Sequence, residues 1–154
     1  MSIEVSNFLN AQSAMPGLIT ILPEDGDGVR SGAYSSTALS LAKVLEREKI
    51  AFKFHTRPER LLEQRGAEWF GPALLLASNI CEFYPDVVKR LLDAISAHVT
   101  QLYPAGSDPK VKMTFIINKS EGGTDAKIKF EGGVDSFSEL LGTIEKVCAS
   151  NGNE

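Results

Sequence analysis

The C-terminal third of the chain holds the pattern that constrains its fold most tightly. Val111–Asn118 and Ala126–Glu131 each alternate apolar with polar residues, as strands with one buried face do. The turn Glu121–Thr124 joins them, and an amphipathic helix follows, opened by the capping-box pattern Ser136–Glu139. A strand pair that runs directly into a capped helix predicts a compact α/β protein. The strand side chains expected to face the core are Val111, Met113, Phe115, Ile117, Ile128 and Phe130.

The first half of the chain reads as a strand, a helix and a second strand. Leu18–Leu22 and Ala51–Thr56 are short β-rich runs, and Ser36–Lys49 between them has one apolar face at helical spacing. Ser35 or Ser36 is placed to cap the first turn of that helix. Because a strand, a helix and a strand follow in order, we expect a right-handed parallel crossover.

The middle of the chain is predicted to be mainly helical. A helical stretch begins at Pro58 and continues toward Phe70, where Gly71-Pro72 breaks it. Ala73–Phe83 is consistent with a helix or with a buried strand, and its length and period favour the helix. Asp86–Tyr103 carries one apolar stripe over about five turns, which predicts a strong amphipathic helix.

These elements together predict the fold class α/β (α+β). We expect one domain over residues 18–150, with a mixed four-stranded sheet and four to five helices packed on it. The sheet is expected to be parallel in its first half and closed by the C-terminal hairpin. Residues 1–17 are expected to form an N-terminal arm that is either flexible or an edge strand.

Composition excludes several classes of protein. A hydrophobic fraction of 43% and a charged fraction of 23% are typical of a globular chain. The longest apolar run, Ala73–Ala77, is far shorter than the ~20 residues of a membrane-spanning helix. Met1–Asn10 has no Lys or Arg and does not resemble a secretory signal, so we expect a cytoplasmic protein. Cys81 and Cys148 are expected to be buried thiols rather than a disulfide, and neither a zinc site nor a cofactor is predicted.

An aromatic segment between two predicted helices is the main candidate for an interface. Glu68–Pro72 contains the only tryptophan of the chain, and aromatic residues can either anchor a protein interface or cap a core. The interface candidates are Trp69, Phe70, Pro72 and Tyr84. The favoured interpretation is a small protein-binding module without catalysis of its own, which is part of a multi-protein or self-associating assembly. Its partner is another protein or a second copy of the chain.

A basic surface for nucleic acid is an alternative hypothesis. The anion-binding candidates are Lys53, Arg57, Arg60, Lys112, Lys127 and Lys129. Residues 43–65 contain seven Lys or Arg against four Glu, a net charge of +3, whereas residues 108–131 reach only +1. Since phosphate contacts dominate nucleic-acid affinity, a net charge of −4 for the whole chain disfavours general nucleic-acid binding but leaves a local patch open.

A metal-dependent phosphate- or nucleotide-handling enzyme is the other alternative. The glycine-rich acidic loop Glu24–Gly32 offers Asp25 and Asp27 as metal ligands, and His55 at the end of a strand could act as a general base. The glycine spacing matches no known phosphate loop, and no nucleophile accompanies the histidine. A solvated loop and a half-exposed strand histidine are the competing interpretations of the same residues.

Overall fold

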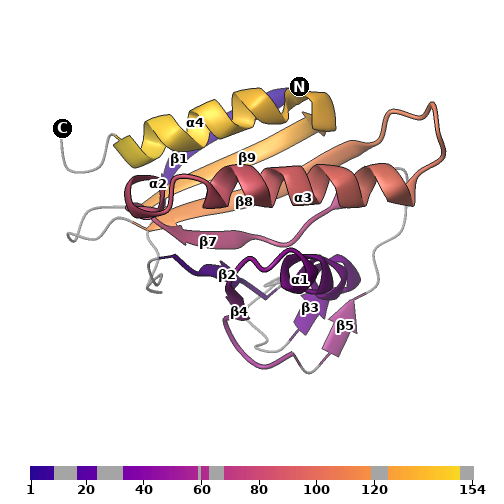
Figure 1. The fold of residues 1–154 in the computed structure, drawn as a ribbon, viewed down its shortest axis with the longest axis horizontal. Coiled ribbons are helices and arrows are strands. Elements are labelled where there is room, and N and C mark those ends of the chain that lie inside the picture. Colours follow the sequence, from indigo (N-terminus) through magenta and orange to yellow (C-terminus); the bar gives the residue numbers. More distant parts are fainter. Residues whose placement is uncertain (9–16, 24–32, 59, 63–67, 119–124, 150–154) are drawn as a thin grey trace.

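The computed structural model describes residues 1–8, 17–23, 33–58, 60–62, 68–118 and 125–149 (Figure 1). Its strands are β1 (Ser2–Phe8), β2 (Ile19–Ile21), β3 (Ala33–Ser35), β4 (Phe52–Phe54), β5 (Arg60–Leu62), β6 (Glu68–Phe70), β7 (Leu74–Ala77), β8 (Lys110–Asn118) and β9 (Asp125–Gly133). Its helices are α1 (Ser36–Arg47), α2 (Ile80–Phe83), α3 (Val87–Leu102) and α4 (Phe137–Ala149), with a 3₁₀ turn η1 (Val134–Ser136) before α4.

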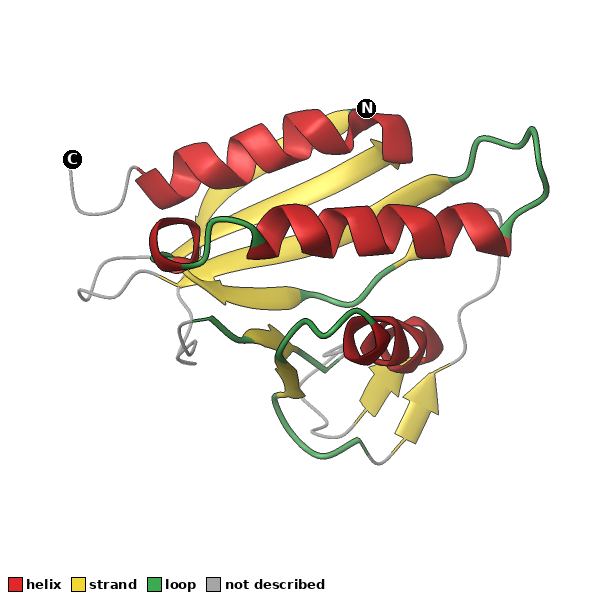
Figure 2. Ribbon diagram, in the orientation of Figure 1, coloured by secondary structure: helices red, strands yellow, loops and turns green. Residues whose placement is uncertain are grey.

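The described strands form one large mixed sheet and one small sheet. The large sheet has seven strands in the order β1-β9-β8-β7-β2-β4, with β6 also paired to β8, and the small sheet consists of β3 and β5. Figure 2 shows α2, α3 and α4 lying across one face of the large sheet. The predicted α/β class is therefore confirmed, but the prediction of a four-stranded sheet is wrong.

The C-terminal hairpin and the helix after it are confirmed. β8 and β9 pair antiparallel, with Met113 opposite Phe130 and Phe115 opposite Ile128. All six side chains that were expected to face the core are buried. Alternation along these strands identified the core-facing side correctly because one face of the hairpin contacts the helices and the other carries mostly polar side chains, with the buried Ile116 as the exception.

The first half of the chain is also built largely as predicted. β2 and β4 pair in parallel on either side of α1 in sequence. Ser35, rather than Ser36, is the N-cap of α1, and its hydroxyl accepts a hydrogen bond of 3.3 Å from the Ala38 amide. Ile19, Ile21 and the apolar face of α1 join the main core, so this unit packs on the same side of the sheet as α3.

The middle of the chain differs most from the prediction. The helix expected from Pro58 to Phe70 is wrong, because β5 and β6 occupy its described residues. Ala73–Phe83 is not one helix, since β7 comes first and only Ile80–Phe83 is helical. β7 lies between β8 and β2 and all four of its residues are buried, so its sequence is continuously apolar and has no strand-like alternation.

The N-terminal residues form an edge of the large sheet. Ser2–Phe8 pairs antiparallel with β9, with Glu4 opposite Lys129 and Val5 opposite Ile128. Of the two alternatives for the arm, these residues adopt the edge strand. Residues 9–16 lie outside the described part of the chain.

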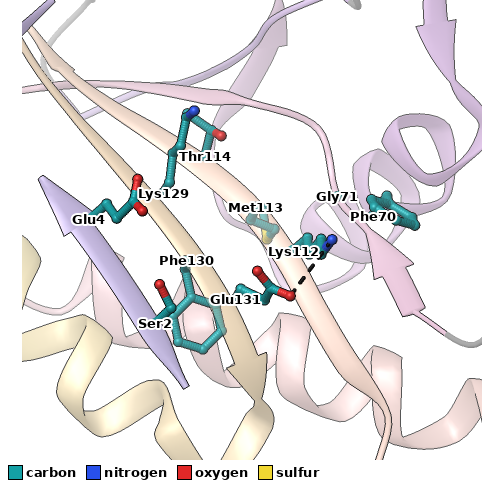
Figure 3. A pocket seen from close by; sticks show the side chains of 10 residues that line it. All are labelled: Ser2, Glu4, Phe70, Gly71, Lys112, Met113, Thr114, Lys129, Phe130 and Glu131. Atoms are coloured by element: carbon teal, nitrogen blue, oxygen red, sulfur yellow. Dashed lines mark ion pairs between the residues drawn. The ribbon is translucent and has the colours of Figure 1, made fainter. Parts of the chain in front are cut away.

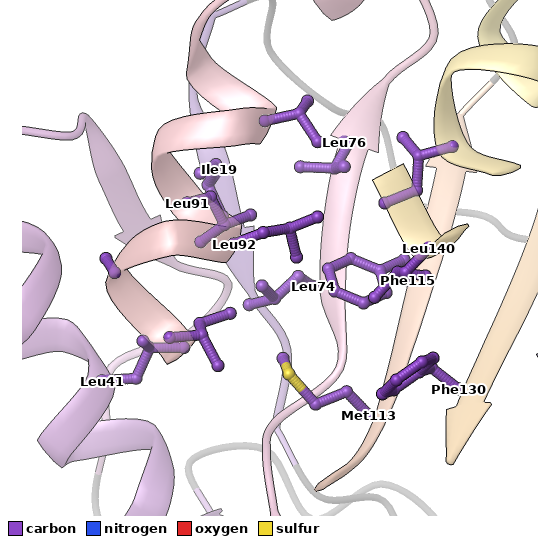
Figure 4. Close-up of a cluster of buried hydrophobic side chains, with 14 of the residues drawn as sticks. Ile19, Leu41, Leu74, Leu76, Leu91, Leu92, Met113, Phe115, Phe130 and Leu140 are labelled. Carbon is purple, nitrogen blue, oxygen red and sulfur yellow. The ribbon is translucent and has the colours of Figure 1, made fainter. Parts of the chain in front are cut away.

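The main core fills the space between the helices and the sheet (Figure 4). Leu41 from α1, Leu91 from α3 and Leu140 from α4 belong to this core together with Leu74 and Phe115 of the sheet. A smaller apolar cluster of Leu22, Leu75 and Ile116, with Ala73 against it, lies apart from this core. Among the described helices none combines the length and apolar character that crossing a bilayer requires.

Candidate functional site

The predicted interface anchor Trp69 is part of the core. Only 3% of its surface is exposed, and its ring meets that of His98 edge to face with centroids 6.0 Å apart. Pairing of β6 with β8 places Trp69 beside Val111, on the helix side of the sheet. Burial excludes Trp69 from direct contact with a partner in this conformation, and Pro72 is buried as well. Burial, and after it the charge of Arg47, lowers the pKa of His98 below its ordinary value of 6.5.

The other two interface candidates reach the surface at separate places. Phe70 is half-buried, and the ammonium group of Lys112 lies 5.4 Å from its ring centroid. Tyr84 is 43% exposed and follows Phe83, which is 61% exposed, at the end of α2. The Tyr84 ring lies over Gly17, where an added Cβ would come within 2.7 Å of it. The structure therefore does not bring the four interface candidates into one surface.

A shallow pocket of about 410 Å³ lies over β1, β9 and β8, and we call it the sheet pocket (Figure 3). Its polar lining residues are Ser2, Glu4, Lys112, Thr114, Lys129 and Glu131, and Phe70 and Gly71 border it. In the strand register Glu4 and Thr114 both lie opposite Lys129. These residues alternate with the core-facing ones, so the sheet pocket is on the face opposite α3 and α4.

The charges of the sheet pocket are of both signs and partly paired. The Lys112 Nζ lies 3.5 Å from a Glu68 carboxylate oxygen and 3.7 Å from one of Glu131. Glu68 on β6, Lys112 on β8 and Glu131 on β9 thus lie side by side on three neighbouring strands, with the lysine between the two acids. Because two carboxylates flank Lys112, this lysine is a poor site for a further anion.

The anion-binding candidates do not form one basic surface. Lys112, Lys127 and Lys129 lie on β8 and β9, whereas Lys53 is on β4 at the opposite edge of the sheet. Arg57 is exposed beyond β4, and Arg60 begins β5 in the small sheet. The candidate cations named from the sequence are therefore on separate parts of the folded protein, and a net charge summed along the chain does not describe one surface.

The residues of the metal-enzyme hypothesis are not brought together among the described residues. Asp25 and Asp27 lie outside the described part of the chain. His55 is exposed just after β4, and its backbone amide donates a hydrogen bond of 2.9 Å to the carbonyl of Ile21. Over the ranges that the structure describes, no group of three His, Cys, Asp or Glu side chains is arranged to hold a metal ion.

The outer edge of β1 borders the sheet pocket. β1 is seven residues long, and β9 is its only neighbour among the described strands. A strand at the edge of a sheet presents a row of backbone N–H and C=O groups that can pair with another strand. Glu4 is exposed on the pocket side, and Val5, on the helix side, is 51% exposed. Apolar and polar surface therefore lie on the two sides of this edge, which no other described strand covers.

Three acidic residues of this site were missed from the sequence. Glu4, Glu68 and Glu131 each belong to a strand, and each lies on the sheet-pocket side by its register. For Glu131 the signal was present, because it follows Lys127 and Lys129 at the spacing of one strand face. Glu68 was missed because a helix was predicted over its position, so its place on a strand face was not considered.

Comparison with known proteins adds no family to this description. The chain matches no protein-family model, no curated protein and no solved structure.

Proposed function

We propose that this chain is a protein-binding module that accepts an extended segment of a partner protein as an added strand along β1. Strand addition to an exposed sheet edge is a recurring mode of peptide recognition, in which backbone hydrogen bonds supply affinity and side-chain contacts supply specificity. In this proposal the sheet pocket receives side chains of the added segment. The protein is then an assembling component rather than a catalyst.

The observation that carries the proposal is the junction of a long edge strand with a pocket of mixed charge. β1 extends over seven residues with one neighbour among the described strands. Glu4 belongs both to this edge and to the lining of the sheet pocket. One segment lying along β1 could therefore form backbone hydrogen bonds and contact the pocket at the same time.

The side chains on β1 define the chemistry of the expected partner. On the pocket side Glu4 is flanked by Ser2 and Ser6, so an added strand should place a Lys or Arg opposite it. On the helix side the exposed Val5 favours an apolar residue. Cross-strand pairs of these kinds each contribute about 0.2–1 kcal/mol. The expected segment thus alternates basic and apolar residues.

A second copy of the chain fits this edge less well than a separate protein. If two β1 strands paired antiparallel about Val5, Glu4 would lie opposite Ser6 of the other copy. The two valines would then meet favourably, but the carboxylate would find no cation. We therefore expect the purified chain to be a monomer in solution at micromolar concentration.

Nucleic-acid binding is the less favoured function on this face. Lys112 already lies within 4.0 Å of two carboxylates, and Glu4 contributes a further negative charge to the sheet pocket. Phosphate groups would meet these acids together with the lysines. Since backbone phosphates dominate nucleic-acid affinity, such mixed charge weakens binding of any sequence.

A charge-swap titration tests the proposal. Two short peptides, one alternating Lys with Val and the other Glu with Val, are titrated against the protein by calorimetry. We expect the wild type to prefer the basic peptide, Glu4→Gln to lose most of the discrimination, and Glu4→Lys to prefer the acidic peptide. One charge pair supplies up to about a fivefold difference in Kd.

Glu46→Lys is the matched control, because Glu46 is exposed on α1, away from β1. It carries the same charge change and should keep the wild-type preference. Melting temperatures establish that each variant is folded. Equal binding of both peptides by the wild type, or a preference that Glu46→Lys shifts as much as Glu4→Lys does, would contradict the proposal.

A further inference from the structure

The two cysteines of the chain lie next to each other in the fold although 67 residues separate them. The Sγ atoms of Cys81, in α2, and Cys148, in the last turn of α4, are 3.1 Å apart. Both are thiols rather than a disulfide. Since an S–S bond is about 2.05 Å long, the sulfur atoms need to approach by only about 1 Å to form one.

The thiols are reachable from solvent through a second pocket. This pocket has a volume of about 370 Å³, and Ser78, Asn79, Glu82 and Glu145 line it with the two cysteines. Cys81 is half-buried, whereas Cys148 is buried with 7% of its surface exposed. A small reagent that enters the pocket would therefore meet the Cys81 sulfur first.

The environment of Cys81 also favours its reactive form. The hydrogen bond with Cys148 lowers the pKa of Cys81 below its ordinary value, against the opposing effects of burial and of the Glu145 carboxylate. The thiolate is the nucleophile in thiol–disulfide exchange. The Cys148 thiol thus lowers the pKa of Cys81, and its sulfur lies close enough to attack the Cys81 sulfur in a second step.

We propose that Cys81 and Cys148 form a redox-active dithiol that a low-molecular-weight disulfide such as oxidised glutathione converts to an intramolecular disulfide. The Cys81 thiolate attacks one sulfur of the small disulfide, which breaks the S–S bond and releases one small thiolate. The Cys148 thiol then loses its proton to solvent and attacks the Cys81 sulfur, which expels the second small thiolate. Two protein thiols lose two electrons and two protons, and the small disulfide gains them as two small thiols.

The disulfide would join α2 to the end of α4. It closes a loop of 67 residues, and cross-links over long loops restrict the unfolded chain most. We expect oxidation to raise the melting temperature by about 5–15 °C. This modification does not depend on partner binding at β1, since both cysteines lie outside β1 and the sheet pocket.

The test is incubation of the purified full chain with defined ratios of reduced to oxidised glutathione. Remaining thiols are alkylated, and the intact mass and the linked peptides are determined by mass spectrometry. We expect one internal disulfide between Cys81 and Cys148, with a midpoint at an intermediate glutathione ratio, and full return to two thiols on reduction. Two alkylated thiols at every ratio, or a disulfide between two chains, would overturn the proposal.

Two single variants test the order of the steps. In Cys148→Ser the exchange should stop at a mixed disulfide of Cys81 with one glutathione. In Cys81→Ser the buried Cys148, with 7% of its surface exposed, should form at least about tenfold less of such an adduct, because the disulfide reagent reaches its sulfur less easily. Circular dichroism verifies that both variants are folded. Equal adduct formation in the two folded variants would show that Cys81 is not the attacking thiol and refute the mechanism.

Discussion

Replacing Gly71 with alanine should destabilise the protein, although the same change at Gly142 should stabilise it. An added Cβ at position 71 would lie 2.6 Å from the Trp69 Cζ3 atom and 2.7 Å from the Met113 Cγ atom. Both distances are shorter than any normal contact, and the indole is held in the core with 3% of its surface exposed. The Gly71 amide also donates a hydrogen bond of 2.9 Å to the Lys112 carbonyl, so the backbone has little freedom to move away.

Gly71→Ala and Gly142→Ala should change the free energy of unfolding in opposite directions. Overpacking of a well-packed core typically costs about 1–3 kcal/mol, which we assign to Gly71→Ala. Gly142 lies within α4, and an added Cβ there meets no atom within 4 Å. Alanine exceeds glycine in helix propensity by about 0.5–1 kcal/mol, so Gly142→Ala should gain that amount. The two variants should therefore differ in free energy of unfolding by about 1.5–4 kcal/mol.

Urea denaturation of the two variants and the wild type measures this difference. The chain has a single tryptophan, Trp69, and its buried indole reports directly on the region that Gly71→Ala disturbs. At about 2–4 °C per kcal/mol, the melting temperatures should move in opposite directions by a few degrees. A neutral or stabilising Gly71→Ala would refute the packing described around Trp69, and a destabilising Gly142→Ala would refute the open surroundings described for Gly142.

Two further perturbations test the core and the titration of the half-buried His98 side chain. Phe115→Ala should lower the free energy of unfolding by about 3–5 kcal/mol in urea denaturation because Phe115 is fully buried, whereas Phe83→Ala, 61% exposed, should change it by less than about 1 kcal/mol. The pKa of His98 is lowered in the folded state, so the unfolded chain binds the proton more tightly. Stability should therefore be retained above pH 6.5 and fall as the pH drops from 6.5 toward the lowered pKa of His98. Melting curves across this range should lose that dependence in His98→Gln and keep it in His55→Gln, and an unchanged profile in His98→Gln would contradict the assignment.

The parts of the fold that the sequence predicts well are those in which apolar residues recur at the regular spacing of a strand or a helix. β8 and β9 alternate over most of their length because the helix side of the hairpin is apolar and the other side mostly polar, with Ile116 as the buried exception, and α1 and α3 each bury one stripe. β7 could not be assigned in this way, since a strand buried on both faces has no period. The four consecutive apolar residues fit a helix equally well.

The candidate sites depend on pairings between distant parts of the chain. Glu68 meets Lys112 only because β6 pairs with β8, and Glu4 joins the sheet pocket only because β1 pairs with β9. No local pattern fixes which strands become neighbours. The contact of Cys81 with Cys148 arises in the same way, from the packing of α2 and α4. For Trp69 the sequence left an interface anchor and a core residue both open, and the pairing of β6 with β8 places it in the core.

Amide hydrogen exchange is the most direct measurement of partner binding along β1. The protein is followed by NMR with and without the alternating Lys and Val peptide at ten times its Kd. Strand addition predicts that exchange of the outward-facing amides of β1 slows by about tenfold, while amides of α3 are unaffected. Unchanged β1 amides together with slowed exchange elsewhere, such as at Phe83 and Tyr84, would show that a partner docks at another surface.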